Sequence, residues 1–212
     1  MTAAQPASTV TEGVRSLEVR WIFPGELGPP VAGWFGRFPA GVESREDSYL
    51  LDPYLPGLSV KLRAGGLLEV KMYRGSPGVL DVADRARGRM ESWQKWSFPF
   101  GPPSQAGEEA AGWRPLRKRI SRFALAGGQI QARVPRLGEE PWCTVELTEV
   151  RTRGEAWWTL AFEAKGPVGL LHGELEATAA FVFAESLPRG VELGANDAMS
   201  YAEWLRRQHD AG

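Results

Sequence analysis

Apolar and polar residues alternate along most of the chain, and this pattern predicts β-strands. The clearest case is residues 59–74, where apolar and charged residues alternate on both sides of a Gly-Gly pair, as they do in a β-hairpin. A three-residue loop over residues 64–66 would place Lys61 opposite Glu69 and gather the charged side chains on one face. A shorter loop would mix charged and apolar side chains. Because the register of a strand pair keeps its apolar face together, we expect the longer loop.

The same alternation predicts further strands on either side of this hairpin. They cover residues 16–23, 45–51, 90–98, 116–125, 130–134, 142–150 and 156–164. Short turns that contain glycine separate several of them, which is typical of antiparallel hairpins. The chain therefore reads as eight or nine strands joined largely by hairpins.

The hydrophobic period becomes helical late in the chain. Residues 169–184 carry apolar residues at helical spacing. Ser200 and Glu203 have the spacing of a helix capping box, which predicts a short helix that ends at about Gln208. Strands followed by helices favour an α+β fold. We expect an eight-stranded antiparallel β-barrel with a polar interior, a tunnel covered by helices mostly from the C-terminal part.

The remaining segments read as connections. Residues 24–42 are rich in glycine and proline with embedded aromatic residues, residues 77–88 form a polar connection, and residues 100–112 form a loop. We expect residues 1–14 to be a disordered N-terminal tail and residues 15–212 to form a single tunnel domain.

Composition and charge narrow the function classes. The 25 basic and 26 acidic residues nearly cancel, so the chain as a whole does not indicate a partner such as duplex nucleic acid or a membrane surface. Cys143 is the single cysteine, which excludes an internal disulfide. The sequence lacks a long apolar run and the features of a signal peptide. We expect a soluble, cytoplasmic protein, and the sequence leaves its oligomeric state open.

The polar faces of the predicted strands carry the candidate chemistry. They hold Glu18, Arg20, Lys61, Arg63, Glu69, Lys71, Lys95, Arg119, Glu146 and Glu163. On an open sheet these residues would face water or a partner protein, and the chain would be an interaction module. In a closed sheet they would face inward and line a cavity. Periodicity does not distinguish a concave polar face from a convex one.

A concave face of this kind predicts an anionic ligand, because buried cations need partners. Phosphate suits arginine and lysine, so the predicted phosphate-binding residues are Arg20, Lys61, Arg63, Lys71, Lys95 and Arg119. The carboxylates of Glu18, Glu146 and Glu163 are candidates to hold Mg²⁺ or Mn²⁺, which would assist phosphate hydrolysis. Within these sets we take Lys71 and Glu146 as candidate catalytic residues. A barrel that binds an anion without turning it over is the alternative.

The order of these pieces resembles the CYTH domain of the triphosphate tunnel metalloenzymes. The matching pieces are Glu18-Val19-Arg20, residues 45–51, Lys61-x-Arg63, Lys71, residues 117–122, Glu146 and Glu163. The resemblance implies an eight-stranded antiparallel tunnel in which basic residues hold phosphates and carboxylates hold a divalent metal. Family members include triphosphatases, acting on inorganic triphosphate, thiamine triphosphate or RNA ends, and some adenylyl cyclases.

The sequence departs from the family pattern at two acidic positions. The family signature on the first strand is Glu-x-Glu-x-Lys, whereas residues 18–22 of this chain are Glu-Val-Arg-Trp-Ile. A Glu-x-Glu pair is usual near the end of the domain, and here Ala161 precedes Glu163. The resemblance therefore implies a phosphate tunnel that has lost two of the family's acidic positions.

Overall fold

Nine antiparallel strands and three α-helices make up the described part of the chain. The structure is a computed structural model that describes residues 13–52, 54–63, 66–99, 112–131 and 140–210. The strands are β1 (Val14–Pro24), β2 (Gly41–Leu50), β3 (Leu58–Arg63), β4 (Leu67–Val82), β5 (Ala86–Pro99), β6 (Trp113–Ala126), β7 (Gln129–Gln131), β8 (Trp142–Thr152) and β9 (Glu155–Lys165). The helices are α1 (Pro29–Phe35), α2 (Leu171–Val182) and α3 (Tyr201–Asp210).

The sheet closes into a barrel. Its strands follow the order β2-β3-β4-β5-β1-β9-β8-β6, and β2 pairs again with β6, so the first and last strands of this order meet. The β2–β6 register runs from Gly41 opposite Arg122 to Leu50 opposite Trp113. β7 is an additional short strand that pairs with β6 outside the ring of eight. The predicted α+β fold with an eight-stranded antiparallel barrel is confirmed, and the open sheet is excluded.

The central hairpin has the expected register. Lys61 on β3 lies opposite Glu69 on β4, and Arg63 lies opposite Leu67. The charged residues of both strands therefore share one face, which lines the inside of the barrel. The prediction that the apolar face sets the register is confirmed.

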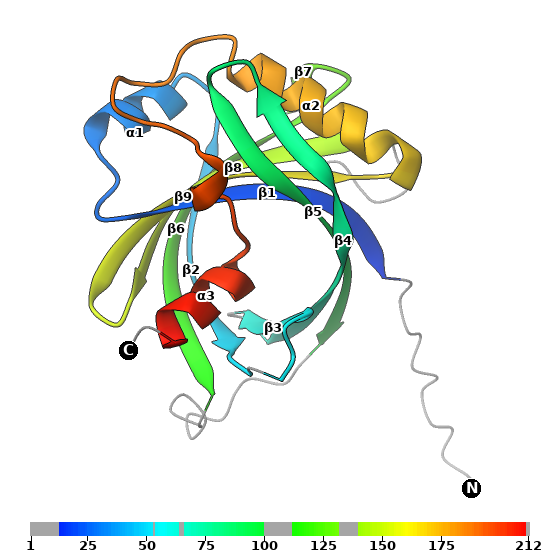
Figure 1. Ribbon diagram of the computed structural model, residues 1–212, viewed down its shortest axis with the longest axis vertical. Coiled ribbons are helices and arrows are strands. Elements are labelled where there is room, and N and C mark those ends of the chain that lie inside the picture. The colour runs from blue at the N-terminus through cyan, green and yellow to red at the C-terminus, as the bar shows by residue number, and fades with distance from the viewer. Residues whose placement is uncertain (1–12, 53, 64–65, 100–111, 132–139, 211–212) are drawn as a thin grey trace, which may run out of the picture.

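The main hydrophobic core lies outside the barrel. Trp21 on β1 packs edge-on against Phe162 on β9, with ring centroids 6.2 Å apart. These two side chains lie on the outward faces of their strands and form one buried cluster with Leu175 and Ala179 of α2 and with Phe35 of α1. Figure 1 shows both helices outside the ring of strands. Because the apolar strand faces point outward under helices, the interior can be polar, as predicted.

A smaller apolar cluster lies at the end of the barrel that α3 approaches. Trp204 and Leu205 of α3 pack there with Ile22, Leu116 and Val150, and Figure 1 shows α3 at this end of the ring. The Ser200 hydroxyl accepts a hydrogen bond from the backbone N–H of Glu203 at 3.3 Å, which is half of the predicted capping box. None of the helices in the described ranges is long and apolar enough to cross a membrane.

Two predicted connections are wrong. Residues 77–88 belong mostly to a long β4–β5 hairpin that turns at Asp84, which has a positive φ of 57°. Register shifts near Gly75 and Gly78 had broken the alternation that marks a strand. Residues 24–42 contain α1, whose first two positions are prolines, where the missing N–H groups cost no helical hydrogen bond.

Some predictions lie outside the described residues. These include the tail up to residue 12, the loop over residues 100–111, and the part of the predicted 130–134 strand that follows Gln131. The division into a tail over residues 1–14 and a single domain over residues 15–212 stays a prediction.

Candidate functional site

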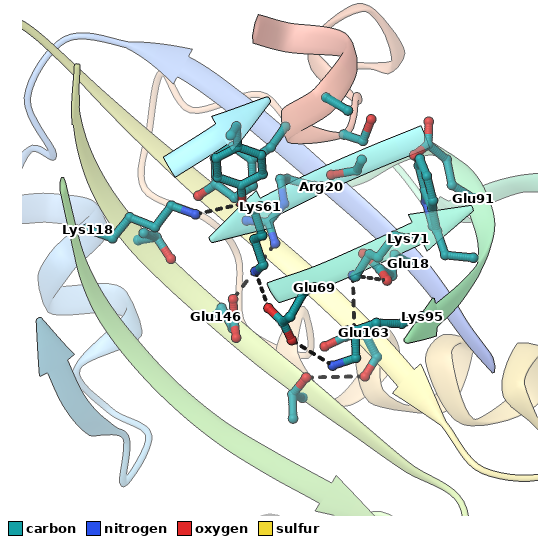
Figure 2. Close-up of a pocket in the computed structure, with 18 of the residues that line it drawn as sticks. Glu18, Arg20, Lys61, Glu69, Lys71, Glu91, Lys95, Lys118, Glu146 and Glu163 are labelled. Carbon is teal, nitrogen blue, oxygen red and sulfur yellow. Dashed lines mark hydrogen bonds and ion pairs between the residues drawn. The ribbon is translucent and has the colours of Figure 1, made fainter. Parts of the chain in front are cut away.

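The inward strand faces enclose a cavity of about 190 Å³. Ten of the residues that line it are lysine or arginine, and five are glutamate. Eight of the nine predicted site residues lie there, namely Glu18, Arg20, Lys61, Arg63, Lys71, Lys95, Glu146 and Glu163. Figure 2 shows labelled side chains from several strands converging on this space. Closure of the barrel has therefore brought together side chains that are far apart in the sequence.

One carboxylate inside the barrel binds three cations. The Glu69 side chain is 2% exposed, and its Oε2 lies 2.9 Å from Lys61 Nζ and 3.0 Å from Arg63 Nη2. Its Oε1 lies 3.3 Å from Lys95 Nζ. Burial alone would raise the pKa of Glu69, but Lys61, Lys95 and Arg63 outweigh it and lower the pKa to about 2. Glu69 is therefore fully ionised at neutral pH.

A second carboxylate, Asp47 on β2, is shared in the same way. Its Oδ2 accepts a hydrogen bond from Lys118 Nζ at 2.9 Å and lies 3.8 Å from Lys61 Nζ. Lys118 also donates to the Tyr49 hydroxyl at 2.9 Å and lies over the ring of Tyr201, 4.1 Å from its centroid. Burial disfavours the charge on Asp47, but Lys118 and Lys61 outweigh it and lower its pKa.

We call Lys61, Arg63, Lys95 and Lys118 the basic cluster. In the described residues these four cations have only Glu69 and Asp47 as ion-pair partners, and Asp47 is shared with Arg45 as well, so at least two positive charges remain without a carboxylate. Burial lowers the pKa of each of its three lysines, because their carboxylate partners do not fully offset the loss of water. The basic cluster therefore has too little negative charge of its own.

A second group of charges in the cavity, next to the basic cluster, is close to balanced. Glu18 on β1 lies beside Glu163 on β9, and Lys71 Nζ lies 2.6 Å from Glu18 Oε1 and 3.4 Å from Glu163 Oε1. Lys165 Nζ lies 2.6 Å from the other oxygen of Glu163. Burial opposes the charge on Lys71, but Glu18 and Glu163 outweigh it and raise its pKa.

The third predicted metal ligand, Glu146, is held by two arginines. Arg122 Nε donates to Glu146 Oε1 at 2.5 Å, and Arg20 Nη2 lies 3.8 Å from Glu146 Oε2. Burial would raise the pKa of Glu146, but Arg122 and Arg20 lower it to about 2. Arg20 also donates to Thr159 Oγ1 at 2.9 Å and lies 4.3 Å from the centre of the Tyr201 ring.

These carboxylates do not fit a divalent metal well. Within the described ranges no three His, Cys, Asp or Glu residues are grouped so that they could hold a metal ion. Each of the three predicted ligands already pairs with at least one lysine or arginine. The binding of Mg²⁺ or Mn²⁺ stays a prediction.

Arg119 is not where the sequence interpretation placed it. It lies on the outer face of β6, where it is 59% exposed and its Nη1 is 2.7 Å from Glu149 Oε1. Lys118 and Arg122 line the cavity instead. The reason lies in the alternation along β6. Leu116 and Ile120 are apolar but lie on the inward face, so the sequence pattern assigned that face to the hydrophobic core and Arg119 to the cavity. Lys118 lies midway between these two residues and therefore shares their face. A lysine on an otherwise apolar face was the signal that could have identified Lys118 as a cavity residue.

Asp47 was also missed, although it lies within a predicted strand. It pairs with Lys118 on β6, with Lys61 on β3 and with Arg45 two residues before it, and the β2–β6 contact that brings Lys118 there exists only in the closed barrel. Nothing in the local sequence marks it as a buried carboxylate.

Comparisons with known proteins give only distant structural likenesses. No protein-family model matches the chain, and no curated protein matches it. A conserved hypothetical protein of Pyrococcus furiosus is similar with a TM-score of 0.44 and 14% identity, over 88% of this chain and 98% of that one. A protein of Pyrococcus horikoshii has a TM-score of 0.46 and 12% identity, over 91% and 99%.

A third solved structure is a putative adenylyl cyclase of Hippeastrum described as having a dominant triphosphatase activity. Its TM-score is 0.34 and its identity 10%, over 82% of this chain and 98% of that one. At these levels of similarity the likenesses assign no activity to this chain.

Proposed function

We propose that this protein is a CYTH-like tunnel protein that binds a small phosphorylated or otherwise polyanionic molecule inside the barrel. The observation that carries the proposal is the basic cluster, in which four cations share two carboxylates. Burying unpaired charge is costly, and an anion that enters the cavity supplies the missing partners. The sequence resemblance to the CYTH domain points to the same ligand class.

The size and lining of the cavity suit a short polyphosphate. At ~10–15 Å³ for each water-sized group, about 190 Å³ has room for on the order of a dozen such groups. Thr148 also lines the cavity, and its buried hydroxyl has no hydrogen-bond partner among the described residues. Arg63 offers a guanidinium fork to phosphate oxygens, while the lysines act as point charges.

Binding without turnover is the form of this function that the ion pairs favour. The predicted catalytic roles of Lys71 and Glu146 stay predictions, because both charges are engaged in ion pairs within the chain. Hydrolysis of a bound triphosphate is the second form. Release of inorganic phosphate in the binding samples distinguishes the two forms.

The test is calorimetric titration with inorganic triphosphate, pyrophosphate and sulfate at matched ionic strength. We expect triphosphate to bind most tightly, and Lys61→Gln to weaken it by roughly ten- to a hundredfold, the value of one charge-assisted hydrogen bond of about 1.5–3 kcal/mol. Arg119→Gln is the matched control, because Arg119 faces away from the cavity. An equal loss in both variants, or no binding of any of these anions, would overturn the proposal.

A further inference from the structure

The carboxylates of Glu18 and Glu163, which lie opposite each other on β1 and β9, already enclose a cation. The Lys71 ammonium lies 2.6 Å from Glu18 Oε1 and 3.4 Å from Glu163 Oε1, so it occupies the space between them. Lys165 takes the other oxygen of Glu163 at 2.6 Å. Figure 2 shows Lys71 joined to both glutamates. A divalent ion could bridge Glu18 and Glu163 only by displacing an ammonium group that both carboxylates hold.

A second fixed cation stands beside the remaining carboxylate. Arg20 follows Glu18 on the inward face of β1, and its guanidinium is positioned by Glu146, by the Thr159 hydroxyl and by the ring of Tyr201. Its side chain is only 15% exposed. A metal ion near Glu146 would therefore face the positive charge of a guanidinium that cannot move away without losing these three contacts.

We infer that the tunnel takes its phosphorylated ligand without a divalent cation, because Lys71 and Arg20 already occupy the positions beside the carboxylates that a metal ion would need. The inference rests on the proposed function and makes it more specific. Hard divalent cations need oxygen ligands with uncompensated negative charge. Glu18, Glu146 and Glu163 pair with Lys71, Lys165, Arg20 and Arg122, so the glutamates have no negative charge to spare.

The first experiment titrates the wild-type protein with inorganic triphosphate in excess EDTA and in excess Mg²⁺. We expect the affinity in EDTA to equal or exceed that in Mg²⁺, which also competes for the free anion. Tenfold or greater tightening by Mg²⁺ would overturn this inference but leave the proposed function standing. Absence of binding under both conditions would overturn the proposed function and this inference with it.

The second experiment measures metal binding directly, by the electron paramagnetic resonance signal of free Mn²⁺. We expect wild-type protein not to deplete the signal at equimolar Mn²⁺. Lys71→Met removes the ammonium group from between Glu18 and Glu163, so we expect this variant to bind Mn²⁺ at least tenfold more tightly than the wild type. Arg119→Met, on the outer face, is the matched control and should not gain affinity. Stoichiometric Mn²⁺ binding by the wild type, or no gain in Lys71→Met, would contradict the inference.

Discussion

Glu69→Gln is expected to make the protein less stable and, at the same time, a stronger anion binder. Glu69 is buried and pairs with Lys61, Arg63 and Lys95. Its pKa falls from an ordinary value of 4.5 to about 2. At ~1.4 kcal/mol for each pKa unit, the folded protein gains about 3 kcal/mol from the ionised carboxylate at neutral pH. Glutamine keeps the size of the side chain but removes this contribution.

The pH dependence has a definite sign. Because the folded pKa of Glu69 lies below its ordinary value, the stabilisation is complete above about pH 4.5 and is lost as the pH falls through about 2. Urea unfolding followed by tryptophan fluorescence should therefore show a gap of about 3 kcal/mol between wild type and Glu69→Gln at pH 7. The gap should narrow steadily as the pH is lowered below 4.5.

Glu69→Gln should strengthen anion binding although it weakens the fold. With Glu69 neutral, an anion becomes the main partner of the three cations, and recovery of up to about 3 kcal/mol would tighten triphosphate binding by up to ~100-fold. Glu149→Gln is the control, because its partner Arg119 is on the exposed outer face and such pairs contribute about 1 kcal/mol or less. Equal stability of Glu69→Gln and wild type at pH 7, or weaker triphosphate binding by the variant, would refute the reasoning.

Three further predictions concern packing and protons. Gly88→Ala should lower the free energy of unfolding, measured with urea, by about 1–3 kcal/mol, because a Cβ there would lie 2.8 Å from Val19 Cγ2 and 2.9 Å from Trp21 Cζ2. An unchanged urea midpoint would count against this prediction. Trp204→Ala should lower the free energy of unfolding by about 3–5 kcal/mol, because it removes the side chain that α3 packs into the end of the barrel. A loss below about 1 kcal/mol would show that the packing of α3 contributes little to stability. Triphosphate binding at alkaline pH should take up protons, because a bound anion raises the lowered pKa values of the three lysines in the basic cluster. Binding enthalpies that are the same in buffers of different ionisation heat would exclude this uptake.

The sequence by itself determined most of the strands and which residues share a face. Alternation placed Lys61 opposite Glu69 and put Glu18 and Arg20 on one side of β1. Side chains alternate between the two faces of a strand whether the sheet is flat or curved. The same rule failed where the pattern was broken, as in the β4–β5 hairpin. It also misled where apolar residues face inward, as on β6, and so Arg119 was chosen in place of Lys118.

Only the tertiary structure decided that the charged face is concave and which charges meet. The contact between β2 and β6 closes the barrel, and it joins Asp47 to Lys118 across 71 residues of chain. The curvature of the sheet sets Lys71 between Glu18 and Glu163, and Arg20 and Arg122 pair with Glu146, so all three expected metal ligands are members of ion pairs. A periodic pattern records the face on which a side chain lies but neither the curvature of the sheet nor the partner across the cavity. Those depend on how distant strands meet.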